Sequence, residues 1–100
     1  MAKEVILTPL AISNYQAIIE YLISEWSENV ANDFVRRFNQ VCDILYLNPQ
    51  IYPVVNLNRQ VRKCVLTKHN VIYFIETKSA IKILTIFDTR QTPEKLSNIF

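Results

Sequence analysis

Two consecutive stripes of apolar residues constrain the fold of this chain more than any other feature of its sequence. The first stripe consists of Ile12, Tyr15, Ile19, Leu22 and Trp26, and the second of Ala31, Phe34, Phe38, Val41 and Leu45. Each stripe advances by three or four residues, which places its side chains on one face of an α-helix. We therefore expect two amphipathic helices, with Trp26 packed into the core at the end of the first.

Local signals mark where these two helices begin and end. Thr8 and Pro9 are typical of a helix start, because Thr can cap free amide groups and Pro suits the first helical position. Ser27 is a second candidate N-cap, and Asn48-Pro49 ends the second stripe. So short a connection at Ser27 predicts an αα-hairpin.

Strand patterns flank the predicted hairpin. A short apolar segment, Val5-Ile6-Leu7, precedes it, and three segments rich in Val, Ile, Tyr and Phe follow at residues 61–67, 71–76 and 81–87. We expect residues 49–60 to be a connecting loop, Asn70 to adopt a left-handed turn conformation, and Thr92-Pro93 to begin a short final helix. The order β-α-α-β-β-β predicts an α+β fold with the helical hairpin packed on an antiparallel sheet.

The last three strand segments carry apolar residues on both faces. In the middle segment Val71, Tyr73 and Ile75 alternate with Ile72 and Phe74. A helical hairpin covers only one face of a sheet, so we expect Tyr73 and Phe74 in the core and a protein partner over the face that the hairpin leaves open.

Length and composition indicate a single domain over residues 1–100. Half of the residues are hydrophobic, only 20% are charged and there is no glycine, so a core can form without disulfides or metal. We expect Cys42 and Cys64 to be buried reduced thiols, and we expect no zinc site and no cofactor. No apolar run approaches the roughly 20 residues of a membrane span and no signal-peptide core is present, so we expect a cytoplasmic protein.

Charge is unevenly distributed along the chain. Residues 1–50 hold three basic and six acidic residues, a net charge of −3, whereas residues 51–100 hold eight basic and three acidic residues, a net charge of +5. The weakly basic total of +2 therefore hides a basic half suited to an anionic partner. Nucleic acid and an acidic protein segment both fit that description.

Several short segments, in this order, resemble the RelE/ParE superfamily of toxins from bacterial type II toxin–antitoxin systems. The segments are Leu7-Thr8-Pro9-Leu10-Ala11, Asn48-Pro49, Tyr52-Pro53, Val61-Arg62-Lys63, Tyr73-Phe74 and Ile83-Leu84-Thr85-Ile86-Phe87-Asp88-Thr89-Arg90. The resemblance implies a compact β-α-α-β-β-β fold and an antitoxin whose C-terminal segment wraps the toxin. It also implies one of two activities: RelE-like members cut messenger RNA in the ribosome, whereas ParE-like members poison DNA gyrase without a known catalytic centre of their own.

Five basic or titratable residues are candidates for RNA cleavage. They are Arg62, Lys63, Lys68, His69 and Arg90. The cations could stabilise phosphate charge, and the histidine, expected in a turn, could move protons near neutral pH. RelE-like enzymes also use a Tyr near the C-terminus, and none follows Arg90 in this chain.

Three of these residues, Arg90, Arg62 and Lys63, are candidates for target binding. Arg90 directly follows the last predicted strand, and an ion pair with Asp88 or Glu94 is its structural alternative. Arg62 and Lys63 are neighbours on a strand, so their side chains should point to opposite faces.

The sequence favours a ParE-like toxin that binds DNA gyrase and is neutralised by a cognate antitoxin. Two alternatives stay open: a ribosome-dependent messenger RNA endoribonuclease, and a degenerate member that only binds an antitoxin. We expect no membrane partner, and either a homodimer or a toxin–antitoxin hetero-oligomer.

Overall fold

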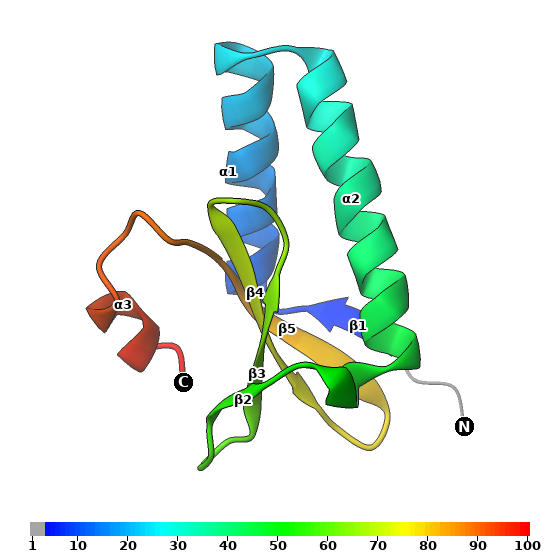
Figure 1. Ribbon diagram of the computed structural model, residues 1–100. Helices are drawn as coiled ribbons and strands as arrows, with labels where there is room; N and C mark the ends of the chain where they lie inside the picture. The colour runs from blue at the N-terminus through cyan, green and yellow to red at the C-terminus, as the bar shows by residue number, and fades with distance from the viewer. Residues whose placement is uncertain (1–3) are drawn as a thin grey trace.

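The computed structural model describes residues 4–100 and contains the expected helical hairpin. Strand β1 (Glu4–Leu7) leads into α1 (Pro9–Glu25), and α2 (Glu28–Leu47) returns alongside it (Figure 1). Both predicted caps are confirmed: the Thr8 hydroxyl accepts a hydrogen bond from the Ala11 amide at 3.1 Å, and the Ser27 hydroxyl accepts one from the Val30 amide at 3.2 Å. These bonds satisfy amide groups that a helix leaves unpaired at its start.

Within residues 4–100 the strands form one five-stranded sheet in the order β1-β5-β4-β3-β2. The three predicted C-terminal strands are confirmed as β3 (Val61–Val65), β4 (Asn70–Glu76) and β5 (Ala80–Asp88), and each pairs antiparallel with the next. Strand β1 adds a parallel pair to β5, with Val5 opposite Ile81. The sheet is therefore mixed, with one parallel pair at its β1 edge and antiparallel pairs elsewhere.

The segment expected to be a loop, residues 49–60, contains regular structure. It holds a 3-10 turn, η1 (Pro49–Ile51), and a short edge strand, β2 (Val54–Asn56), which pairs antiparallel with β3. The prediction of an unstructured connection was wrong here because the β-branched pair Val54-Val55 extends beside β3, despite the flanking Pro and Asn residues.

The helical hairpin covers one face of the sheet and forms the main core with it. Helix α2 buries all five members of the second stripe, and the sheet contributes the fully buried Ile72, Phe74, Ile81 and Ile83. The ring of Tyr15 from α1 packs edge-on against Phe38 of α2, with centroids 4.8 Å apart. This contact holds the two helices together above the sheet.

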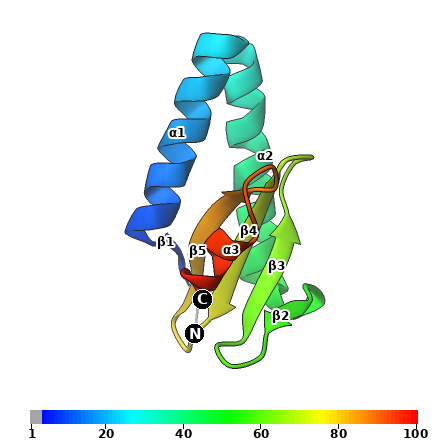
Figure 2. The ribbon, with the colours of Figure 1, turned by 90° about the vertical axis from the view of Figure 1, so that its left-hand side faces the viewer.

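The C-terminal segment of the chain covers part of the opposite face. The short helix α3 (Glu94–Ser97) lies across the sheet (Figure 2), and Leu96, Ile99 and Phe100 pack on a second buried cluster. That cluster consists of Val61, Val71, Tyr73, Leu84 and Phe87. Tyr73 and Phe74 are thus both core residues, as expected. The protein's own C-terminus thus covers part of the face for which a protein partner was expected.

Three local expectations fail for identifiable reasons. Trp26 follows the last turn of α1 and is 69% exposed, so it is not a core residue. Asn70 is the first residue of β4, and its side-chain amide donates a hydrogen bond to the Thr67 hydroxyl. Among the residues described, the non-glycine residue with a positive φ is Gln60, at 56°. The final helix begins at Glu94 with Pro93 as its N-cap and no side-chain capping bond, so the predicted capping by Thr92 was wrong.

Candidate functional site

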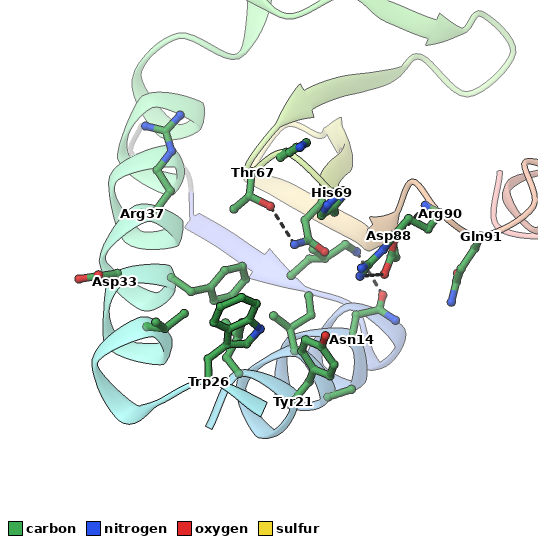
Figure 3. Close-up of a pocket in the computed structure, with 18 residues that line it drawn as sticks. Asn14, Tyr21, Trp26, Asp33, Arg37, Thr67, His69, Asp88, Arg90 and Gln91 are labelled. Carbon is green, nitrogen blue, oxygen red and sulfur yellow. Dashed lines mark hydrogen bonds and ion pairs between the residues drawn. The ribbon is translucent and has the colours of Figure 1, made fainter. Parts of the chain in front are cut away.

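A groove of about 680 Å³ lies between the helical hairpin and the adjacent end of the sheet (Figure 3). Its lining comes from α1 and α2 on one side, and from the β3–β4 loop and the end of β5 on the other. This volume lies within the range of about 300–1,000 Å³ that ligand sites usually have. The groove therefore has the dimensions of a binding site.

The helical wall of the groove is largely apolar. It includes Ile18, Leu22 and Phe34, with Tyr21 and Trp26 at its outer part. The last two side chains are 50% and 69% exposed. Large aromatic side chains left open to water beside a concave surface are typical of places where another molecule binds.

The opposite wall is polar and carries three of the five predicted site residues. Lys68 and His69 come from the β3–β4 loop, and Arg90 follows β5; Figure 3 shows His69 and Arg90 on this side of the groove. On the helical side, α2 adds a further cation, Arg37, whose Nε donates a hydrogen bond to the Leu66 carbonyl at 3.2 Å. The groove thus places cationic groups opposite an apolar surface.

Arg90 is held by a carboxylate two residues before it. Its Nε and Nη2 donate to Asp88 Oδ1 and Oδ2 at 2.9 and 2.7 Å, and its backbone amide donates to Oδ1 at 2.9 Å. The side-chain bonds from Arg90 are the main reason that the pKa of Asp88 lies below its ordinary value. The carboxylate in turn raises the pKa of Arg90, with a smaller contribution from Tyr21. The ion pair weighed as a structural alternative for Arg90 is therefore present.

Arg62 and Lys63 lie outside the lining of this groove. Arg62 alternates with the buried Cys64 on the face that carries the main core, and its Nη1 donates to the Tyr52 carbonyl at 2.6 Å. Lys63 shares its alternation with Val61, which belongs to the cluster on the opposite face. The two side chains thus point apart as predicted, and the five candidates do not form one cluster.

The basic second half of the sequence is likewise spread over the molecule. Of its eight Lys and Arg residues, Lys68 and Arg90 line the groove. Arg59 instead donates to the Ile99 carbonyl at 3.1 Å, which ties the β2–β3 turn to the C-terminal segment. A surplus of positive charge in sequence does not become one positive face in the structure.

The sequence patterns did not indicate Asn14, the polar residue that joins α1 to the sheet in the helical wall of the groove. Asn14 Oδ1 accepts hydrogen bonds from the Thr85 hydroxyl at 2.7 Å and from the Ile86 amide at 3.1 Å. At the start of the same helix, the Thr8 hydroxyl donates to the Leu84 carbonyl at 2.7 Å. The sequence offers one retrospective signal for Asn14: it is a polar residue directly before the stripe member Tyr15.

The two cysteines are free thiols within the main core. Burial raises the pKa of Cys42 to about 11, and it also raises the pKa of Cys64. Burial, together with a hydrogen bond to Cys64, raises the pKa of Tyr52 to about 12. Groups with such values are neutral at physiological pH, so neither thiol is suited to act as a nucleophile.

Two other kinds of feature, a metal site and a membrane-spanning helix, are absent from residues 4–100. No three His, Cys, Asp or Glu side chains there gather closely enough to hold a metal ion. No helix in that part of the chain has the length and apolar character needed to cross a bilayer.

Comparisons with known proteins agree with this architecture. Residues 5–93 match the family model of the ParE toxin of the type II toxin–antitoxin system parDE. The fold is similar to a chain of a solved structure described as "Chromosomal ParDE TA system from P. aeruginosa", with a TM-score of 0.72 and 18% identity over 87% of this chain and 96% of that chain. No curated protein matches the sequence. Since the family model spans most of the chain, the protein belongs to the ParE toxins of type II toxin–antitoxin systems.

Proposed function

We propose that this ParE toxin acts by binding DNA gyrase and that a segment of its cognate antitoxin neutralises it by docking in the groove. The observation that carries the proposal is that the apolar helical wall of the groove lies opposite a cationic rim, which is formed by Lys68 and Arg90. An amphipathic helix with acidic flanks matches both surfaces at once, because its apolar face can enter a hydrophobic groove while its carboxylates reach the rim.

Charge balance within the groove favours an acidic partner. Among the residues described, Asp88 pairs with Arg90 and Asp33 pairs with Arg36, so the two carboxylates that line the groove are already neutralised. Lys68 and Arg37 have no carboxylate partner within residues 4–100. Their charges remain available to a docking segment, and electrostatic attraction of this kind speeds encounter and fixes orientation.

The arrangement of the candidate residues favours a binding mode of action over RNA cleavage. Arg62 and Lys63 lie away from the groove, and no Tyr follows Arg90 in the sequence. Lys68, His69 and Arg90 do share the groove, which supports the ribosome-dependent endoribonuclease as the second candidate. In that case the cations would stabilise phosphate charge while His69 transferred a proton.

Expression of the toxin without its antitoxin tests the proposal. Messenger integrity and plasmid topology are followed together after induction. Gyrase poisoning predicts double-strand breaks and loss of negative supercoiling while messengers remain intact. Early cuts at fixed codon positions would overturn the gyrase assignment in favour of the endoribonuclease. Absence of toxicity together with tight antitoxin binding would instead indicate a member that keeps only its antitoxin surface.

A further inference from the structure

The amide of Asn14 has a fixed orientation. Its Oδ1 accepts from the Ile86 backbone amide at 3.1 Å and from the Thr85 hydroxyl at 2.7 Å. A backbone amide can only donate, so the atom that faces it must be the oxygen. Asn14 Nδ2 therefore points away from β5, and Figure 3 shows the oxygen at the dashed line with the nitrogen directed away from it.

This nitrogen is a donor without an acceptor. No hydrogen bond from Asn14 Nδ2 to any of residues 4–100 is present, although Asn14 lines the groove. Nor is it a buried unsatisfied atom among the residues described, so water reaches it at the groove. Two N–H groups of Asn14 are thus presented to whatever occupies the site.

Apolar lining residues lie beside Asn14 on α1 and β5. Ala17 and Ile18 of α1 and Ile86 of β5 also line the groove, and Gln91 is a further polar lining residue. A docked segment with an uninterrupted apolar face would displace water from Asn14 Nδ2 without accepting a hydrogen bond from it, and this desolvation would weaken binding. An occupant with an oxygen acceptor at that depth avoids this cost.

We propose that Asn14 is a specificity-determining residue that requires a hydrogen-bond acceptor within the apolar face of the docked segment. The inference rests on the proposed docking of a partner helix in the groove. It commits to one occupant, an amphipathic helix of a protein partner with an acidic or amide side chain among its apolar residues. The cations of Arg37 and Lys68, which have no carboxylate partner within residues 4–100, favour the acidic choice, because their charges are complementary to a carboxylate.

Asn14→Asp removes the Nδ2 donor with little change in side-chain shape. The aspartate keeps an oxygen for Thr85 and Ile86 and replaces the donor Nδ2 by an acceptor oxygen. Asn32→Asp is the matched control, because it makes the same substitution at an exposed residue of α2 that does not line the groove. Thermal unfolding of each variant verifies that the fold is retained.

The probe is a phage-displayed library of helical peptides with randomised side chains, selected on each purified protein. The wild type should enrich Glu, Asp or Gln at one position within the apolar face. For a selected peptide, exchange of that residue for Lys should weaken binding roughly tenfold to hundredfold. Asn14→Asp should abolish or invert this preference, whereas Asn32→Asp should change it by less than about fivefold.

Three results would overturn the inference: wild-type selection of uninterrupted apolar faces, failure of the wild type to enrich any peptide, or equal effects of the two variants. A measurement on the wild type alone covers the case in which Asn14→Asp does not fold. In NMR spectra, the side-chain amide resonances of Asn14 should shift on addition of a selected peptide with Glu at the enriched position, and they should not shift with the Lys version of that peptide. If neither peptide shifts these resonances, the inference is also overturned. The preference can be found in a protein that is not toxic, so its outcome is separate from that of the gyrase proposal.

Discussion

The Asp88 carboxylate holds the Arg90 guanidinium through two hydrogen bonds, at 2.9 Å to Nε and 2.7 Å to Nη2, at the edge of the groove. This bidentate pair fixes the direction of the arginine and occupies one side of it. The remaining N–H groups of Arg90 stay available, since the side chain is 58% exposed. Asp88 therefore positions the residue that the sequence singled out for target binding.

Replacement of Arg90 should separate toxicity from stability. Arg90→Ala removes an exposed side chain, so the free energy of unfolding should change little. Growth inhibition on induction should fall at least roughly tenfold if Arg90 contacts the target, as expected for a lost charge-assisted hydrogen bond. Lys78→Ala, at an exposed turn between β4 and β5, is the control. If Arg90→Ala keeps full toxicity, Arg90 does not contact the target.

The Asp88–Arg90 pair should make stability depend on acid. The pKa of Asp88 is depressed in the folded protein, so its contribution is present above the unfolded pKa, near the ordinary value of 3.8, and is lost as pH falls through the folded pKa. Wild type should be slightly more stable than Asp88→Asn at pH 5, and the difference should vanish under strongly acidic conditions. Urea unfolding at a series of pH values measures it, and a difference independent of pH would contradict the assignment.

The thiols of the main core should react slowly while the protein is folded. A pKa of about 11 for Cys42, against an ordinary 9.0, lowers its thiolate fraction near pH 8, by roughly a hundredfold for two pKa units. Burial also raises the pKa of Cys64, so this thiol should react slowly as well. Modification by a thiol reagent with and without urea tests this. Equal rates in the two conditions would show that the core opens readily.

Thr8 should be important for stability, because one hydroxyl has two roles. It caps α1 at the Ala11 amide and donates to the Leu84 carbonyl of β5. Thr8→Ala should therefore cost about 1–3 kcal/mol of the free energy of unfolding, through the lost cap and an unpaired carbonyl. Ser27→Ala loses only a cap bond, to the exposed Val30. Chemical denaturation should rank the first variant as the more damaging, and the reverse order would contradict this account of Thr8.

Removal of the C-terminal segment should expose an apolar face of the sheet. Deletion of residues 96–100 takes away Leu96, Ile99 and Phe100, which cover the cluster around Tyr73 and Phe87. Tyr73 and Phe100 lie with ring centroids 5.1 Å apart. The truncated protein should bind the dye ANS and self-associate, since contiguous exposed apolar patches promote association. Substitution of Lys95 alone is the control, and an unchanged dye signal after truncation would contradict this role of the segment.

The sequence predicted the parts of this fold that depend on periodicity. The second helical stripe is buried throughout, because a regular spacing on one long helix leaves little freedom about which face meets the sheet. Trp26 broke the pattern because it lies beyond the final turn of α1, where periodicity no longer fixes direction. Strand β2 was missed because pairing with β3 is a tertiary contact that overrides local turn propensity.

The candidate site was predictable only in part. Lys68, His69 and Arg90 stand out by residue type, and their chain positions near strand ends bring them to one side of the groove. Asn14 and Tyr21 belong to the opposite wall, and no local signal in α1 indicates which residues of the sheet they will face. The groove is a product of tertiary packing, so its apolar wall and the fixed amide of Asn14 became visible only in the structure.

The most direct test of the account is a supercoiling assay with purified gyrase, relaxed plasmid and the purified toxin. If the toxin poisons gyrase, supercoiling activity should be lost and linear DNA should accumulate as the toxin is added, and the cognate antitoxin should reverse both effects. Full supercoiling activity with the folded toxin in excess would contradict the proposal that this ParE toxin acts on gyrase.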